Sequence, residues 1–221
     1  MTPGSSDVVS KTGKRMSEQN HRAEMLAAAA TEAARCQRCP LFRNATQVVF
    51  GEGPLDAAIM MVGEQPGDQE DRTGRPFVGP AGRVLDEALA QAGLERAQIY
   101  ITNVVKHFKY EQRGKRRLHK KPNQSEIEQC RWWLDRELAL VSPKLVVALG
   151  VTAAEALSGR RLVLSRSRGQ PMRFLGDRPG LVTQHPSAIL RVPDDAARRR
   201  AFAEFAQDVQ AARKLTEAGN S

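Results

Sequence analysis

Residues 57–82 have the sequence AAIMMVGEQPGDQEDRTGRPFVGPAG. The apolar segment from Ala57 to Val62 predicts a buried strand, the glycine-rich and acidic middle predicts a loop, and a helix is expected to begin near Gly82. A strand, a loop and a helix in this order open an α/β unit. The stretch therefore places the chain in the α/β fold class.

Three further apolar segments continue this alternation along the chain. The additional predicted strands are Gln98 to Val105, Leu145 to Leu149 and Gly180 to Thr183. Helical patterning separates each strand from the next, which predicts a three-layer α/β/α sandwich around a central parallel sheet of about four strands. Because ligand sites of such sheets lie at the carboxyl ends of the strands, the loops after Val62, Val105 and Thr183 are expected to meet.

Length and composition predict one compact domain. The chain has 221 residues, of which 41% are hydrophobic, enough for a single core. Residues 1–20 are polar and without periodicity, so we expect a flexible N-terminal arm ahead of a single domain over residues 21–221. At their junction the Ala-rich stretch from Asn20 to Arg35 predicts a helix.

The apolar pattern also bears on location. No apolar run approaches the roughly 20 residues that cross a bilayer, and the N-terminal stretch lacks the apolar core of a signal peptide. We therefore expect a cytoplasmic protein without a membrane partner. No helix face carries more apolar residues than one core needs, which favours a monomer.

Positive charge is concentrated in one segment. The formal net charge is +9, and the basic residues between positions 106 and 121 are opposed only by Glu111. These residues are Lys106, Lys109, Arg113, Lys115, Arg116, Arg117, Lys120 and Lys121. Such a patch attracts a phosphate backbone through counterion release. Charge alone does not separate a nucleic-acid partner from simple solubility.

Three cysteines and one histidine are candidate metal ligands. Cys36 and Cys39 form a close pair, Cys130 is distant, and His107 lies between them in sequence. An odd number of cysteines in a chain without an export signal argues against a disulfide framework. Imidazole replaces thiolate in some zinc and iron–sulfur centres, so His107 can supply a fourth ligand. At this point zinc, an iron–sulfur cluster and unligated thiols all remain open.

Chemically distinctive residues follow the predicted strands. Residues 63–71, GEQPGDQED, combine glycines with four carboxylates that can bind a metal, hold a water or cap the next helix. Phe77 is poorly placed to join a core but well placed to stack on a flat base. The amide of Asn103 can make paired hydrogen bonds to a base edge. His185 can be structural or catalytic, and Ser187 can cap a helix or contact phosphate.

These segments, in this order and spacing over roughly residues 30 to 210, resemble the uracil-DNA glycosylase superfamily, in particular its branch of small enzymes with a [4Fe–4S] cluster. The matching motifs are Cys36 to Leu41, Gly63 to Glu70 and His185 to Ser187. The resemblance implies the uracil-DNA glycosylase fold, a [4Fe–4S] cofactor and uracil-containing DNA, preferably single-stranded, as the substrate.

The resemblance also implies roles for individual residues. Phe77 would stack on uracil, Asn103 would read its polar edge, and His185 would stabilise the negative charge on the departing base. This fits glycosidic cleavage, which produces an oxocarbenium-like sugar and an anionic base. The remaining expected substrate contacts are Gly63, Asp68, Arg117 and Ser187.

Three departures from the ordinary iron–sulfur pattern indicate the subtype. His107 stands where the usual third cysteine is found, which implies a cluster held by Cys36, Cys39, His107 and Cys130. Gln65 stands where a small residue is usual and can orient a water or the sugar. The segment between His107 and Cys130 is longer than usual and resembles the X-type loop.

In X-type members a histidine of this loop attacks the anomeric carbon after uracil leaves, so the protein becomes bonded to DNA. The match to Gly114–His119, GKRRLH, implies that His119 is this nucleophile. Glu64 can orient the imidazole or accept its proton. Arg116 and Arg117 are expected to clamp phosphates. Two alternatives stand beside this hypothesis: a turnover glycosylase in which His119 only contacts DNA, and a non-catalytic iron–sulfur protein that binds nucleic acid.

Overall fold

A five-stranded sheet forms the centre of the molecule. The computed structural model describes residues 6–218. Its sheet has the order β2 (Ile99–Asn103), β1 (Ile59–Gly63), β5 (Leu145–Leu149), β7 (Arg178–Thr183) and β6 (Pro171–Phe174). The first four strands are parallel, and β6 is antiparallel to β7. The predicted α/β class is confirmed, and the sheet has five strands, four of them parallel, where the sequence predicts a parallel sheet of about four.

Within the central sheet, the edge strand β6 is not predicted by the sequence pattern. It begins with Pro171, contains Arg173 and is largely accessible to solvent, so no apolar run marks it. It reverses into β7 through a turn in which Gly176 and Asp177 have φ angles of 74° and 55°. Proline is tolerated because an edge strand leaves some of its amide groups unpaired.

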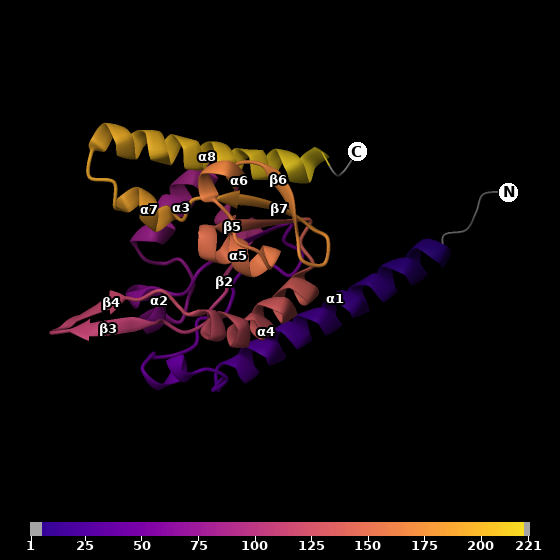
Figure 1. The fold of residues 1–221 in the computed structure, drawn as a ribbon. Helices are drawn as coiled ribbons and strands as arrows, with labels where there is room; N and C mark the ends of the chain where they lie inside the picture. Colours follow the sequence, from indigo (N-terminus) through magenta and orange to yellow (C-terminus); the bar gives the residue numbers. More distant parts are fainter. Residues whose placement is uncertain (1–5, 219–221) are drawn as a thin grey trace.

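Helices cover both faces of the sheet. On one face lie α1 (Ser6–Ala33), α4 (Gln124–Val141) and α5 (Val151–Ser158); on the other lie α3 (Pro80–Gln91), α7 (Pro186–Leu190) and α8 (Asp195–Ala218). Figure 1 shows α8 above the sheet and α1 and α4 below it. Side chains of β1 alternate between the two layers: Met60 and Val62 pack towards α4, and Ile59 and Met61 towards α8. The molecule is thus an α/β/α sandwich.

Short elements complete the chain. They are the 3₁₀ helices η1 (Pro40–Arg43) and η2 (Arg96–Gln98) and the α-helices α2 (Asp68–Thr73) and α6 (Leu164–Ser167). Among the residues that the structure describes, no helix combines the length and apolar character needed to span a membrane.

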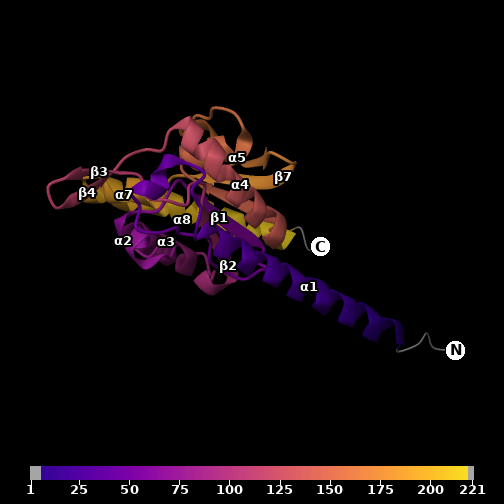
Figure 2. The same ribbon diagram turned by 90° about the horizontal axis from the view of Figure 1, so that it is seen from below.

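Helix α1 is longer than predicted. The sequence predicts a helix from Asn20, whereas α1 begins at Ser6, so residues 6–20 of the expected arm are helical. Residues 1–5 and 219–221 lie outside the described residues, and the division into an arm and a domain over 21–221 stays a prediction. The Arg22 guanidinium donates to the carbonyl oxygens of Leu140 and Val141 at the end of α4. Beyond this anchor, α1 extends away from the sheet (Figure 2).

A β-hairpin stands apart from the central sheet. Its strands, β3 (Tyr110–Arg113) and β4 (Arg116–His119), are antiparallel, and Tyr110 is opposite His119. Gly114 makes the turn with a φ of 57°. The hairpin, residues 110–119, contains the predicted insertion and projects from the molecule near α2 (Figure 1). His119 is therefore the last residue of a strand outside the core.

Candidate functional site

The candidate site lies at the carboxyl ends of β1, β2 and β7. Gly63 and Asn103 are partners at the ends of neighbouring strands. The loop after β7 brings His185 to the same edge, where its ring lies beside that of Phe77, with the centroids 5.8 Å apart and the planes tilted by 32°. We call the four residues Gly63, Phe77, Asn103 and His185 the base pocket, a name that follows the role expected for them from the sequence.

Steric contacts determine the position of Phe77. Its ring is buried and its φ is 53°, a value in the left-handed region. A Cβ atom added at Gly63 would lie 2.3 Å from Asn103 Oδ1 and 2.7 Å from Phe77 Cζ. A Cβ atom at Gly82 would lie 1.8 Å from the Phe77 carbonyl oxygen. The two glycines therefore let the phenyl ring lie against the strand ends, where a flat ligand can stack on it.

Asn103 presents an unused hydrogen-bond acceptor. The residue is 2% exposed, and Oδ1 has no partner among the described residues. An unsatisfied buried polar group costs about 1–3 kcal/mol. A ligand N–H group at this position would remove that cost, so Asn103 is suited to recognising a polar ring edge.

A buried ion pair supports Asn103 from behind. Lys106 and Glu137 are both inaccessible to solvent and form a salt bridge. Lys106 Nζ also donates to the Asn103 carbonyl oxygen and to Thr102 Oγ1, each at 2.7 Å. Lys106 is one of the basic residues expected to attract a phosphate backbone, and for this residue the expectation is wrong, because its ammonium group uses all three donors inside the core. No apolar periodicity distinguishes it from the exposed lysines.

Glu64 and His119 meet beside the base pocket. His119 Nε2 lies 3.1 Å from Glu64 Oε1, and Thr152 Oγ1 donates to Glu64 Oε2 at 2.5 Å. Burial raises the pKa of Glu64, but the hydrogen bonds from His119 and Thr152 oppose burial and, with smaller electrostatic contributions from the two imidazoles of His119 and His185, lower it below its ordinary value. Glu64 is therefore an oriented carboxylate. Thr152, on the first turn of α5, is a contributor that the sequence analysis does not identify, because no motif marks it.

His185 is held as a neutral donor. Its Nδ1 accepts a hydrogen bond from the Ser187 amide at 3.1 Å and lies 2.8 Å from Ser187 Oγ. Burial lowers the pKa of His185 to about 4; Glu64 opposes this shift, and Arg191 and His119 add to it. A neutral ring that accepts at Nδ1 carries its proton on Nε2. Ser187 thus orients His185, and Nε2–H can donate to a ligand.

Gln65 joins the loop after β1 to the hairpin. Its Nε2 donates to the carbonyl oxygens of Lys109 and Lys120, at 3.1 and 3.0 Å, and its Oε1 accepts from the Lys109 amide at 3.1 Å. These two lysines flank the hairpin on either side. The Gln65 amide therefore binds the backbone on either side of the hairpin, and its expected contact with a water or the sugar stays a prediction.

Arg117 joins the hairpin to α2. It donates to Asp68 Oδ1 at 2.5 Å and to Asp71 Oδ2 at 2.6 Å, and its side chain is 10% exposed. The guanidinium also lies over the rings of Phe108 and Tyr110, 5.4 and 5.0 Å from the centroids. Arg117 and Asp68 contact each other, and the substrate contacts expected of both stay predictions. Arg116, the neighbouring expected phosphate clamp, is exposed.

The candidate metal ligands lie on the α4 side of the sheet. Cys39, His107 and Cys130 are buried, and Cys36 is partly exposed. The Lys106 amide donates to Cys130 Sγ and Trp133 Nε1 donates to Cys36 Sγ, each at 3.1 Å. Burial raises the pKa of Cys130 to about 12, Lys106 opposes the shift, and the nearby Cys39 and Cys36 thiols add to it. The three sulfur atoms thus lie within electrostatic reach of one another.

These donors fit an iron–sulfur cluster. His107 Nδ1 is buried and without a hydrogen-bond partner in the described part of the chain, so a ligating role would satisfy it. Thiolate sulfurs that accept N–H hydrogen bonds are typical cluster ligands. Within residues 6–218 no three His, Cys, Asp or Glu side chains already converge as they do around a single ion. A four-iron cluster is wider than one ion, and its ligands stand further apart.

Fold and site together define an α/β/α protein with a candidate site for a planar, polar ring at the carboxyl ends of its strands, beside a basic hairpin. Residues 50–210 match the family model described as the uracil DNA glycosylase superfamily. The chain belongs to this superfamily.

Curated relatives agree with this assignment. The chain is 38% identical over 179 residues to a type-4 uracil-DNA glycosylase of Thermotoga maritima, covering 80% of this chain and 90% of the relative. It is 39% identical over 165 residues to a type-4 uracil-DNA glycosylase of Pyrobaculum aerophilum, covering 72% and 81%. A protein of the same description from Sulfurisphaera tokodaii is 43% identical over 167 residues, covering 72% and 73%.

Proposed function

We propose that the protein is an iron–sulfur uracil-DNA glycosylase of the X-type, which excises uracil from DNA and then bonds to the exposed sugar through His119. The observation that carries the proposal is the 3.1 Å contact between His119 Nε2 and Glu64 Oε1 beside the base pocket. The contact pairs a nucleophilic nitrogen with a carboxylate held by a second hydrogen bond, which is the arrangement of an activated nucleophile.

Excision follows from the base pocket. Phe77 stacks on uracil, Asn103 pairs with its polar edge, and His185 Nε2–H donates to a uracil oxygen as negative charge develops. The bond between C1′ and the base breaks with its electron pair on uracil, leaving a cationic sugar. Glu64, ionised and beside that sugar, stabilises the positive charge.

Capture then uses the hairpin. Glu64 takes the proton of the His119 Nε2–H bond, the electron pair of that bond stays on Nε2, and this pair forms the bond to C1′. The charge of the sugar cation is neutralised, the proton rests on the carboxylate, and the protein is joined to DNA. Gln65 and Arg117 act as positioning residues, because their contacts hold the hairpin on which His119 lies.

The proposed cofactor is a [4Fe–4S] cluster held by Cys36, Cys39, His107 and Cys130. When bound, it would supply rigid links between the segment before β1, the loop after β2 and α4, together with one-electron redox chemistry. The proposed partner is uracil-containing DNA, preferably single-stranded, contacted by exposed hairpin cations such as Lys115 and Arg116. We further propose a cytoplasmic monomer.

The second candidate is a turnover glycosylase, favoured by the description of the relatives as type-4 uracil-DNA glycosylases. In it a water attacks the sugar and His119 only contacts DNA. The 52% exposure of the His119 side chain leaves room for such a water.

A denaturing gel separates these functions. Incubation with a single-stranded uracil oligonucleotide should give a shifted band that resists heat and detergent, and a duplex should give it more slowly. An alkali-cleavable abasic product without the band would indicate turnover, and unaltered DNA would contradict both enzymes. His119→Ser should abolish the band and retain uracil release. His21→Ser, an exposed histidine on α1, is the matched control and should behave like the wild type.

A further inference from the structure

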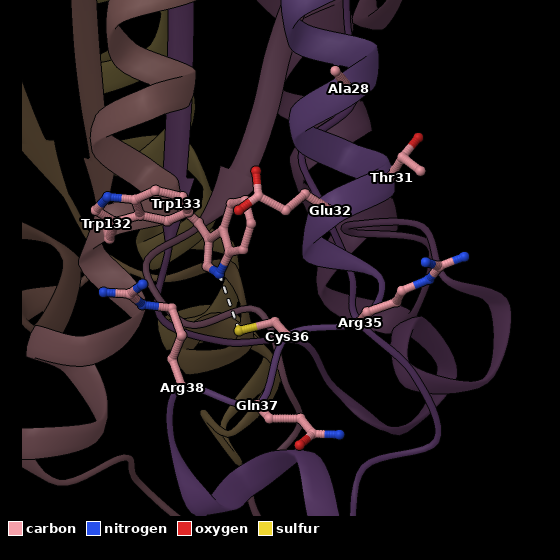
Figure 3. A pocket seen from close by; sticks show the side chains of 9 residues that line it. All are labelled: Ala28, Thr31, Glu32, Arg35, Cys36, Gln37, Arg38, Trp132 and Trp133. Carbon is pink, nitrogen blue, oxygen red and sulfur yellow. Dashed lines mark hydrogen bonds between the residues drawn. The ribbon is translucent and has the colours of Figure 1, made fainter.

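A cavity of about 580 Å³ opens beside Cys36, between the end of α1 and the face of α4 (Figure 3). Its lining includes Arg35, Cys36, Arg38, Trp132 and Trp133. It lies away from the base pocket, on the side of the proposed cluster ligands. Because the other three ligands are buried, Cys36 is the ligand through which this centre would reach solvent.

The cavity carries excess positive charge. Arg35 has no ion pair among the described residues, and the Arg38 guanidinium stacks on Trp132 at 4.6 Å from the ring centroid. Arg136 is neutralised by Glu32 at 2.6 Å. Two uncompensated cations at the mouth of a concave surface attract anions and raise their rate of encounter.

A tryptophan connects the cavity to the cysteine. Trp133 Nε1 donates to Cys36 Sγ at 3.1 Å, as drawn in Figure 3. The indole is 2% exposed and packs edge-on against Trp132, with ring centroids 4.5 Å apart. A hydrogen bond to a ligating sulfur stabilises the more negative, reduced state of an iron–sulfur centre and so raises its reduction potential.

We propose that this cavity is an electron-exchange surface for anionic one-electron carriers, an inference that rests on the proposed cluster. With the cluster bound, Cys36 would carry one electron from it to an acceptor docked against Arg35 and Arg38, and the acceptor would be reduced as the cluster is oxidised. No bond forms or breaks, and no proton moves. Tunnelling falls steeply with distance, so the partly exposed Cys36 provides the shortest path to a carrier in solution.

The test uses the cluster-loaded full chain and two one-electron oxidants of opposite charge, ferricyanide and tris(phenanthroline)cobalt(III), with the change in visible absorption on electron transfer followed by stopped flow. At low salt Arg35→Glu with Arg38→Glu should slow ferricyanide about tenfold and accelerate the cationic oxidant. Arg199→Glu with Arg200→Glu on α8 makes the same change in net charge on the opposite layer and should alter neither rate. Equal effects of the two double variants would overturn the proposal.

A second variant tests the path itself. Trp133→Phe keeps an aromatic ring and removes the N–H donor, so voltammetry should show a lower reduction potential than in the wild type. An unchanged potential would overturn the role of Trp133. A brown protein with unaltered rates in the arginine variants contradicts only this inference. A colourless protein contradicts the proposed cofactor, and the electron-exchange surface with it.

Discussion

The base pocket and the hairpin that carries His119 are held in place by different forces. In the pocket, Phe77 and Asn103 lie where neighbouring strand ends and missing Cβ atoms leave room for them. The hairpin shares no strand with the central sheet and is attached through the polar contacts of Gln65 and Arg117. The side chains of the base pocket are displaced by a single added methyl group, because close contacts hold them. The hairpin is held by several hydrogen bonds, so its attachment weakens one bond at a time. Uracil release and covalent capture should therefore be separable by mutation.

Gly63→Ala should have the largest effect on activity, because the added methyl group clashes with side chains of the base pocket. The new methyl group must displace Asn103 or Phe77, and a displacement of about 1 Å can lower a rate about 100-fold. Uracil release and adduct formation should both fall by about this factor in single-turnover assays.

Gly114→Ala is the corresponding change in the hairpin. An added Cβ meets nothing within 4 Å there, although the φ of 57° makes the substitution strained. It should leave uracil release unchanged. Equal losses of uracil release in the two variants would contradict the contrast between the regions.

Gln65→Ala should have the next largest effect, confined to capture. Each lost hydrogen bond is worth about 1 kcal/mol, and about 1.4 kcal/mol changes a rate tenfold. We expect adduct formation to slow about tenfold while uracil release stays within about twofold. Gln112→Ala, a hairpin glutamine whose side chain donates to the Gly114 carbonyl oxygen, is the control. A parallel loss of uracil release would show that Gln65 serves the pocket as well.

Thr152→Val should give a smaller, pH-dependent effect. Removal of its hydrogen bond raises the pKa of Glu64 towards the ordinary value, because that bond helps to lower it. The ionised carboxylate is present above its pKa, so the fall of adduct formation at acid pH should begin at a higher pH in the variant. Thr152→Ser should restore the wild-type profile. Identical profiles for Val and wild type would exclude this role.

The smallest effect is expected from the titration of His185, which should leave the rate of uracil release unchanged near neutral pH. Burial lowers its pKa to about 4, so the ring stays neutral and donating between about pH 6 and 8. Uracil release should be flat over that range. The stability that neutral His185 contributes is complete above its unfolded pKa and declines as the pH falls from there towards 4, which acid unfolding monitored by circular dichroism can follow. A step in uracil release within the flat range would contradict the assignment.

The sequence predicts the sheet better than the connections that make the site work. Leu145–Leu149 is found as predicted, because a fully buried parallel strand is a continuous apolar run. Strand β6 escapes prediction because half of an edge strand faces solvent. The approach of His185 to Phe77 follows from strand ends that share one edge.

The polar contacts are harder to predict, because the local sequence does not indicate which partner a polar side chain contacts. Lys106, Arg116 and Arg117 belong to one basic run, yet the first is buried with Glu137, the second is exposed and the third folds onto Asp68 and Asp71. Thr152 is one of many threonines, and only the fold brings it to Glu64. Such roles depend on residues far away in the chain.

The left-handed backbone at Phe77 has a final consequence for affinity. For a residue other than glycine this conformation costs about 1–2 kcal/mol, and the energy is spent when the protein folds, before any ligand arrives. The Phe77 ring is therefore preorganised, and the free energy of binding includes no entropic cost for ordering it. Truncating the side chain should weaken binding largely through lost contact, with little change in the mobility of the loop.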